Sequence, residues 1–215
     1  IQTIYDVPAP ETTFSRGILS AEFARFPELR DAWWEQTERL ESRRRTRRQE
    51  EWQVAGSVIV ASKFTLRSFA AAGYDTGKVR LVPYGCPVPA PAVTFPVAKD
   101  RLQLLWVGTF GVRKGAHYLL EAWRKADLGK LATLEVYGSV MLPAKALEPL
   151  PSGILLHGPK PRPLVFEALR QAEALVFPTL CDGFGMVIGE AWAQGVPVLT
   201  TERAGAAERL VPGEN

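Results

Sequence analysis

Residues 102–123 read LQLLWVGTFGVRKGAHYLLEAW, and this stretch decides the fold. The apolar run 102–107 predicts a buried strand, and the segment from Lys114 to about Ala126 predicts a helix. The inward-facing residues of that helix are expected to be Leu119, Leu120 and Trp123. Glycines in the turn between strand and helix allow backbone N–H groups to approach a ligand closely. The stretch therefore predicts one strand–turn–helix unit of an α/β protein.

The same rhythm continues to the end of the chain. Short apolar runs, each read as a strand, occupy 133–137, 154–156, 174–177 and 196–200. Helical patterns lie between them, at 164–171 and 186–194. Unbroken apolar strands alternating with helices are typical of a parallel sheet that is covered on both faces. We therefore expect a Rossmann-like α/β fold with ligands at the carboxyl ends of the strands.

The first half of the chain carries a shorter version of this pattern. Strands are predicted at 57–61 and 78–82, with Ser62 as the N-cap of a helix over about 63–72. Prolines then follow at high density, namely Pro83, Pro87, Pro89, Pro91 and Pro96. Proline at that density resists helix and interior strand. We therefore expect a domain over 1–82, a linker over 83–100 and a second domain over 101–215.

A charged segment over 28–52 predicts a long surface helix, with apolar anchoring expected from Trp33, Trp34, Leu40 and Trp52. The basic run 43–48 raises the alternatives of nucleic-acid binding and membrane-surface contact. Acids nearly balance the bases, however, and two acid–base pairs have helical i,i+4 spacing. These pairs are Glu35 with Arg39 and Glu41 with Arg45. The pattern favours a solvated helix and argues against a nucleic-acid partner.

Composition excludes several other classes of protein. The formal net charge is only +3 over 215 residues, which does not indicate nucleic-acid binding. Cys86, Cys181, His117 and His157 stand apart without metal-ligand spacing, so we expect neither a metal site nor a disulfide framework. We therefore expect both cysteines to be reduced and the protein to be cytoplasmic. Peripheral contact at the inner membrane surface stays an open alternative.

Two strand-to-helix turns carry the residues suited to chemistry. The first is VGTFGVRKG at 107–115. Its Arg113 and Lys114 lie beside Gly-rich backbone at the start of a helix, an arrangement that suits a diphosphate. A tight turn with two exposed cations explains this segment equally well. In the second, FPTLCDGFGMVIGE at 177–190, Asp182 and Glu190 can accept hydrogen bonds from hydroxyl groups of one long ligand. Alone, Asp182 could be a helix N-cap.

In combination these segments resemble family 4 retaining glycosyltransferases of the GT-B fold. The resemblance rests on the Gly-rich stretch 104–122 and on Asp182 and Glu190, two acids separated by seven residues. Segments 57–62, 82–85 and 156–162 follow in the family's order. The resemblance runs from about residue 50 to the end. It implies transfer of a sugar, with retention of configuration, from a nucleotide diphosphate sugar to an acceptor that could be a glycan, a lipid or a small molecule.

The resemblance also implies roles for individual residues. Lys114, with Arg113 close by, would hold the diphosphate and stabilise the leaving group. Asp182 would lie against the transferred sugar, and Glu190 would bind the ribose. The other implied donor contacts are Gly108, Thr109, Gly183, Phe184, Gly185 and Met186, with His157 and Pro159 beside the nucleobase. Members of this family work without a bound metal or other cofactor.

Several features depart from the family pattern. The first acid is Asp182 where Glu is usual, and Thr109 stands where many members have Arg. Both ends look cut, so we expect the remnant of an acceptor-side domain and a truncated donor domain. Tyr5, Phe14, Phe23 and Phe26 are expected to be core residues. Two alternatives to the transferase therefore stay open, a non-catalytic or split nucleotide-sugar-binding module and a GT-B nucleotide-sugar epimerase.

Overall fold

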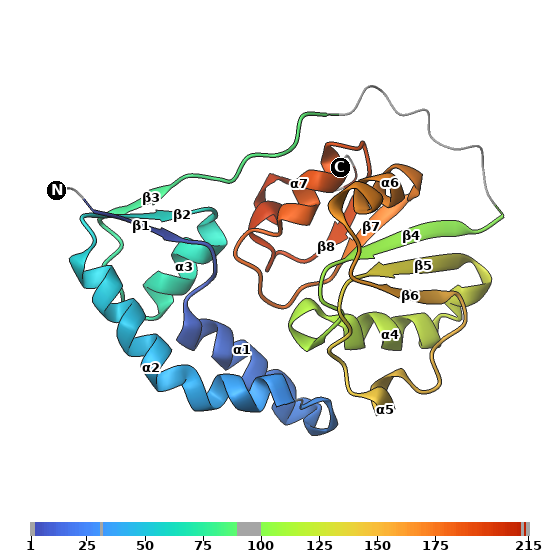
Figure 1. Ribbon diagram of the computed structural model, residues 1–215, viewed down its shortest axis with the longest axis horizontal. Coiled ribbons are helices and arrows are strands. Elements are labelled where there is room, and N and C mark those ends of the chain that lie inside the picture. The colour runs from blue at the N-terminus through green and yellow to red at the C-terminus, as the bar shows by residue number, and fades with distance from the viewer. Residues whose placement is uncertain (1–2, 31, 90–99, 212, 214–215) are drawn as a thin grey trace.

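Two parallel β-sheets, each with helices packed against it, make up the protein (Figure 1). The computed structural model describes residues 3–30, 32–89, 100–211 and 213, without the side chains of residues 32, 33, 38 and 42. The strand orders are β1-β2-β3 and β6-β5-β4-β7-β8, and every pairing is parallel. The predicted α/β fold class is therefore confirmed. Most of the predicted linker, residues 90–99, lies outside the described residues.

The first sheet belongs to the amino-terminal part. Its strands are β1 (Ile4–Val7), β2 (Ser57–Val60) and β3 (Val79–Leu81). Its helices are α1 (Thr12–Arg25), the 3-10 turn η1 (Pro27–Leu29), α2 (Ala32–Val54) and α3 (Lys63–Ala71). Strand β1 was not among the sequence predictions, because four residues at the start of the chain, only the last of them buried, offer little pattern. Ser62 caps α3 as predicted, since its hydroxyl accepts the Thr65 N–H.

The second sheet carries the larger core. Its strands are β4 (Leu102–Val107), β5 (Ala132–Tyr137), β6 (Ile154–Gly158), β7 (Ala174–Phe177) and β8 (Val198–Thr200). Its α-helices are α4 (Ala116–Lys125), α5 (Ala144–Leu147), α6 (Arg162–Gln171) and α7 (Met186–Trp192). Its 3-10 turns are η2 (Val112–Lys114), η3 (Leu128–Lys130) and η4 (Gly205–Arg209). The inner strands β4 and β7 have buried centres, as expected where a sheet is covered on both faces. The edge strands differ, because Leu155 and Leu156 of β6 and Leu199 of β8 are exposed.

One helix boundary differs from its prediction in a way that affects the site. The sequence predicted a helix beginning at Lys114, but Lys114 ends η2 and α4 begins at Ala116. Gly115 separates the two with φ 79°, a left-handed conformation that L side chains rarely adopt. The chain therefore turns sharply after Lys114, and this turn sets the direction of that side chain.

Helix α2 is the long charged helix that the sequence predicted. Arg47 and Glu51 form an i,i+4 pair at 2.7 Å. The predicted pair of Glu41 with Arg45 is wrong, because Glu41 is buried and its carboxylate has no hydrogen-bond partner among the described residues. Glu41 lies two turns beyond the buried Trp34 and so shares its inward face. None of the described helices is long and apolar enough to span a membrane.

The two parts share a core through α1. Leu19 and Phe23 of α1, with Leu29 and Trp34, are buried in one cluster with residues of η2, α4 and β5. The expected core role of Phe23 is confirmed, whereas Phe14 packs on Phe64 within the amino-terminal part. The amino-terminal part is therefore docked firmly against the larger sheet along α1 and α4.

A buried histidine lies at this contact. The Nε2 atom of His117 on α4 is 3.0 Å from Oε1 of Glu22 on α1, and Nδ1 has no partner among the described residues. Burial lowers the pKa of His117 below its usual value, and the neighbouring Glu22 opposes that shift only in part. The folded protein therefore favours neutral imidazole.

Stability should consequently fall on acidification. Because the pKa of His117 is depressed in the folded state, the unfolded chain takes up the proton first as the pH drops below about 6.5. We expect the free energy of unfolding to decrease from pH 7.5 to pH 5.5, and less so in His117→Gln. Urea unfolding at both pH values measures the difference. An equal decrease in parent and variant would contradict this assignment.

Candidate active site

The strand order places a crevice at the centre of the larger sheet. Strand β4 lies between β5 and β7, so the chain leaves β4 and β7 toward opposite faces of the sheet. Helix α4 covers one face, and α6 and α7 lie on the other (Figure 1). Open α/β sheets bind ligands where the strand order reverses in this way. The loops after β4 and β7 are the two Gly-rich segments that the sequence singled out.

Glycines allow these loops to approach one another closely. Gly115 faces the turn after β7, where an added Cβ would lie 2.0 Å from the carbonyl oxygen of Pro178. Gly138, which follows β5, faces the turn after β4. A Cβ added to Gly138 would lie 2.0 Å from the carbonyl oxygen of Gly108. No larger residue fits either position without moving backbone. The close spacing of the loops at the strand ends therefore depends on these two glycines.

Lys114 and Asp182 meet across the crevice. The Lys114 ammonium donates a hydrogen bond to the Asp182 carboxylate, and the two side chains are only 13% and 15% exposed. The ammonium also lies 4.6 Å from the centre of the Phe177 ring. Burial lowers the pKa of Lys114, and Asp182 acts in the opposite direction. Two residues that the sequence assigned separately thus form one pair.

Asp182 is held on both oxygens. Its Oδ1 accepts the backbone N–H of Phe184 at 3.2 Å, while Oδ2 accepts from Lys114. The Phe184 N–H, which was predicted to contact the donor, is therefore already hydrogen-bonded within the protein. The N–H of Gly185, in contrast, has no acceptor among the described residues. Gly185 adopts φ 82° at the start of α7 and turns the loop back over the crevice.

A cavity of about 370 Å³ occupies this crevice. Its lining includes the predicted residues Gly108, Lys114, Asp182, Phe184, Gly185 and Met186. Sequence reasoning missed Pro8 and Tyr84, which reach the cavity from the amino-terminal part and the segment after β3. Tyr84 packs edge-on against Phe184 at 5.3 Å. A pocket of this size with few convergent polar groups is suited to a small-molecule ligand.

The other predicted residues lie elsewhere. Thr109 and Arg113 line a neighbouring cavity beside α1. Gly183 packs against the amino-terminal part, with its carbonyl oxygen accepting from Ser62 and Thr65. Glu190, His157 and Pro159 line neither cavity. Of the predicted site residues, six therefore line the crevice, Thr109 and Arg113 line the cavity beside α1, and the other four lie outside both cavities.

Glu190 and His157 each have a protein partner. Arg162 of α6 donates to Glu190 Oε1 at 2.8 Å, and the second carboxylate oxygen has no partner among the described residues. His157 belongs to β6 rather than to the following loop, which corrects the predicted boundary. Its ring stacks on Tyr137 at 4.8 Å and is hydrogen-bonded to Glu135. No group of three or more metal-binding side chains occurs within the part of the chain that the structure describes.

Comparison with known proteins adds the family. The model of the family described as "Glycosyl transferases group 1" matches residues 101–215, which contain both loops of the crevice. This chain belongs to that family. A Klebsiella pneumoniae protein, an uncharacterized 41.2 kDa protein in the cps region, is 29% identical over 120 residues. That match covers 54% of this chain and 32% of the Klebsiella protein.

Solved structures confirm the GT-B fold. The glycosyltransferase WaaG, involved in lipopolysaccharide biosynthesis, matches with a TM-score of 0.65 and 19% identity, over 96% of this chain and 58% of WaaG. Anabaena HepE in complex with UDP and glucose matches with a TM-score of 0.59 and 18% identity, over 74% and 48%. The group 1 chain thus spans about a third of its curated relative and about half of these structures.

Ser62 joins the two parts of this chain. Its buried hydroxyl donates to the Gly183 carbonyl at 2.6 Å and accepts the Thr65 N–H at 3.0 Å. An added Cβ on Gly183 would lie 2.4 Å from the carbonyl oxygen of Pro8, so the loop after β7 lies directly against the amino-terminal part. Ser62 therefore caps α3 and holds this loop at the same time.

Replacing Ser62 should destabilise the protein. Ser62→Ala removes the cap of α3 and one hydrogen bond to Gly183, so we expect a loss of about 1–2 kcal/mol in the free energy of unfolding. Urea unfolding followed by circular dichroism measures it. Ser20→Ala, at an exposed position of α1, is the matched control and should change stability little. Equal midpoints for both variants would show that the Ser62 contacts contribute nothing.

Proposed function

We propose that this chain binds a nucleotide diphosphate sugar in the crevice and transfers the sugar to an acceptor with retention of configuration, as in family 4. The Lys114–Asp182 pair at the strand-order reversal carries this proposal. It sets a cation and a carboxylate side by side in a cavity of about 370 Å³. A cation suits a diphosphate and a carboxylate suits sugar hydroxyl groups.

Lys114 stabilises charge on the leaving group. During transfer the acceptor oxygen bonds to the anomeric carbon, the bond from that carbon to the diphosphate breaks, and the acceptor's hydroxyl proton passes to the departing diphosphate. Negative charge then develops next to the Lys114 ammonium, in a partly buried site where such stabilisation is strong. Asp182 is fixed by Lys114 and by the Phe184 N–H, so it presents a positioned acceptor to the sugar.

We place the nucleoside beyond the diphosphate, along α7 and the end of β6. The free oxygen of Glu190 accepts from the ribose, and residues 158–160 flank the nucleobase. HepE was crystallised with UDP and glucose, which makes uridine nucleotides the first to test. The amino-terminal part supplies Pro8 and Tyr84 to the same cavity, so donor binding depends on the docked arrangement of both parts.

Glu190→Ala should weaken binding of the nucleotide. Loss of a hydrogen bond between a charged carboxylate and a ribose hydroxyl weakens the binding free energy by about 1.5–3 kcal/mol, which raises Kd at least about tenfold. Calorimetric titration with UDP, GDP and ADP measures this loss for whichever nucleotide binds. Glu167→Ala, at an exposed position on α6, is the control and should bind like the parent. Unchanged affinity of Glu190→Ala would remove the ribose role.

Transfer is proposed to need no metal. The Lys114 ammonium, with the amides beside it, takes the place that a divalent cation would have at the diphosphate. Incubation with UDP-glucose, UDP-N-acetylglucosamine, GDP-mannose or ADP-glucose, with and without chelator, tests this together with the reaction itself. Release of the nucleoside diphosphate and the anomeric configuration of the product, read by proton NMR, should show retention and no effect of chelator.

The same assay separates the two rival functions. A nucleotide-sugar-binding module would bind a donor but give no product with any acceptor. A nucleotide-sugar epimerase would convert the donor alone, without acceptor. An inverted product would contradict the retaining mechanism, and loss of activity with chelator would contradict metal independence.

A further inference from the structure

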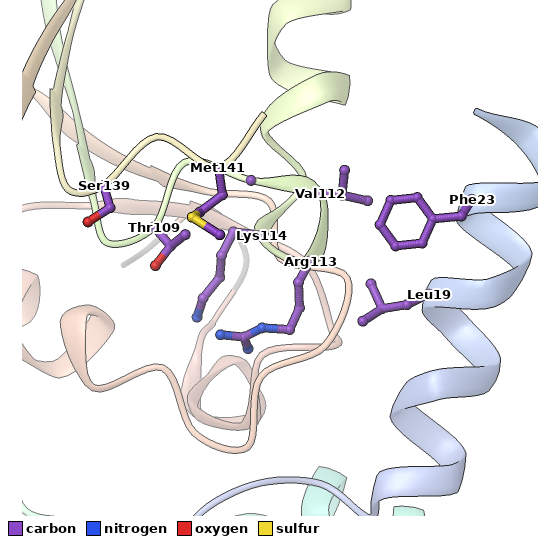
Figure 2. A pocket seen from close by; sticks show the side chains of 9 residues that line it. Leu19, Phe23, Thr109, Val112, Arg113, Lys114, Ser139 and Met141 are labelled. Carbon is purple, nitrogen blue, oxygen red and sulfur yellow. The ribbon is translucent and has the colours of Figure 1, made fainter. Parts of the chain in front are cut away.

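A second cavity, of about 270 Å³, lies between α1 and the turns that follow β4 and β5 (Figure 2). Leu19 and Phe23 project from α1 toward Val112, and Met141 and Ser139 lie on the opposite side with Thr109 (Figure 2). Since Leu19 and Phe23 are four residues apart, they share one face of the helix. The two parts of the protein therefore each supply a wall, and much of the lining is apolar.

Arg113 gives this cavity its charge. Its guanidinium donates to the carbonyl oxygen of Cys181 at 3.0 Å, and no carboxylate is bonded to it within the described ranges. Lys114 also borders the cavity, but its charge is matched by Asp182. Arg113 thus leaves a net positive charge beside apolar side chains. A guanidinium placed in this way favours a carboxylate or a phosphate group.

The two cavities meet at one residue. Lys114 lines both, and the adjacent residues Gly108 and Thr109 line one cavity each. Arg113 lines the cavity beside α1 but not the crevice. A molecule held against α1 therefore has its polar end next to the place where the leaving diphosphate would lie. An acceptor must have this position, because its hydroxyl group has to reach the anomeric carbon.

We propose that the cavity beside α1 is the acceptor subsite, and that it takes a molecule with an apolar group next to an anionic group. The proposal rests on the transferase function argued above. The apolar group packs on Leu19, Phe23 and Met141, and the anionic group pairs with Arg113. Arg113 then serves the acceptor rather than the donor diphosphate, which departs from the role that the sequence resemblance implied.

Hexyl phosphate is a probe with both features. Its affinity is measured by ligand-observed NMR on the full chain, with and without a saturating concentration of the nucleoside diphosphate that binds. We expect hexyl phosphate to bind in both conditions, and inorganic phosphate and hexyl glucoside to bind at least about tenfold more weakly, since each lacks one feature. Arg113→Gln should abolish the preference for hexyl phosphate over hexyl glucoside.

Met141 provides the matched variants. It is half-buried in the wall, so Met141→Glu can place a carboxylate there that repels the anionic probe, while Met141→Leu keeps the size and the apolar character. We expect Met141→Glu to weaken hexyl phosphate binding about tenfold or more and to leave nucleotide binding and the thermal unfolding midpoint unchanged. Met141→Leu should resemble the parent.

Three results would overturn the proposal. They are an affinity for hexyl phosphate that Met141→Glu does not change, displacement of hexyl phosphate by the nucleoside diphosphate, and equal binding of hexyl phosphate and inorganic phosphate. Displacement would place Arg113 in the donor site. Failure of every nucleoside diphosphate to bind would instead count against the transferase function, so the two failures are distinct.

Discussion

Lys114→Met is expected to lower kcat/KM for sugar transfer by about 10²–10³-fold, the usual consequence of removing one group that stabilises charge in a transition state. Two effects act together. The diphosphate loses its cation, and the partly buried carboxylate of Asp182 loses its partner and then repels the ligand. Nucleoside diphosphate binding, measured by calorimetry, should weaken at least about tenfold. Methionine keeps the apolar stem and removes the ammonium, including its contact with the Phe177 ring.

Two further variants isolate the cause. Lys125→Met removes a lysine of α4 that is exposed and paired with Glu121, and should bind like the parent. The double variant Lys114→Met with Asp182→Asn removes the repulsive carboxylate as well, so part of the lost affinity should return. A Lys114→Met protein that binds and transfers normally would show that the pair is structural only.

Gly115→Ala has the largest expected effect on stability. The substitution forces a side chain into φ 79°, and its Cβ would lie 2.0 Å from the Pro178 carbonyl oxygen. The left-handed backbone costs about 1–2 kcal/mol, and overpacking against backbone adds about 1–3 kcal/mol. The loops after β4 and β7 would be pushed apart, so nucleotide binding should be lost as well. Urea unfolding and calorimetry measure the two effects.

Gly195→Ala is the matched control for this prediction. Gly195 has a similar φ of 73°, but nothing lies within 4 Å of an added Cβ. It should therefore show only the backbone contribution, about 1–2 kcal/mol, with nucleotide binding intact. If Gly115→Ala and Gly195→Ala destabilise the protein equally, the close approach of the two loops is not required for stability.

Local patterns in the sequence were sufficient for most of the larger sheet. Strand runs such as 102–107 and 174–177 are mostly apolar and are followed by glycine or proline, so hydrophobic pattern and turn residues identified them. The crevice followed from the same reasoning, because Lys114 and Asp182 each come after a strand at the end where ligands bind. The sequence did not indicate that the two side chains form a pair.

Features that depend on distant parts of the chain were not predicted. Pro8 and Tyr84 reach the crevice from segments about 100 residues or more before the loop after β7. Tyr84 belongs to segment 82–85 of the family resemblance, but neither residue was assigned to the site. Arg113 and Lys114 are neighbours in sequence, yet only Lys114 lines the crevice, because η2 and the left-handed Gly115 set their directions. The burial of Glu41 likewise depends on how α2 packs, whereas the charge pattern suggested a surface position.

The most direct test of the donor site is calorimetric titration of the 215-residue chain with UDP, GDP and ADP, each with and without chelator. We expect at least one of the three to bind, with an affinity that chelator does not change and that Lys114→Met weakens. Absence of binding by all three to a chain that circular dichroism shows to be folded would contradict the proposed donor site in the crevice. Binding that requires a divalent cation would contradict the role given to Lys114.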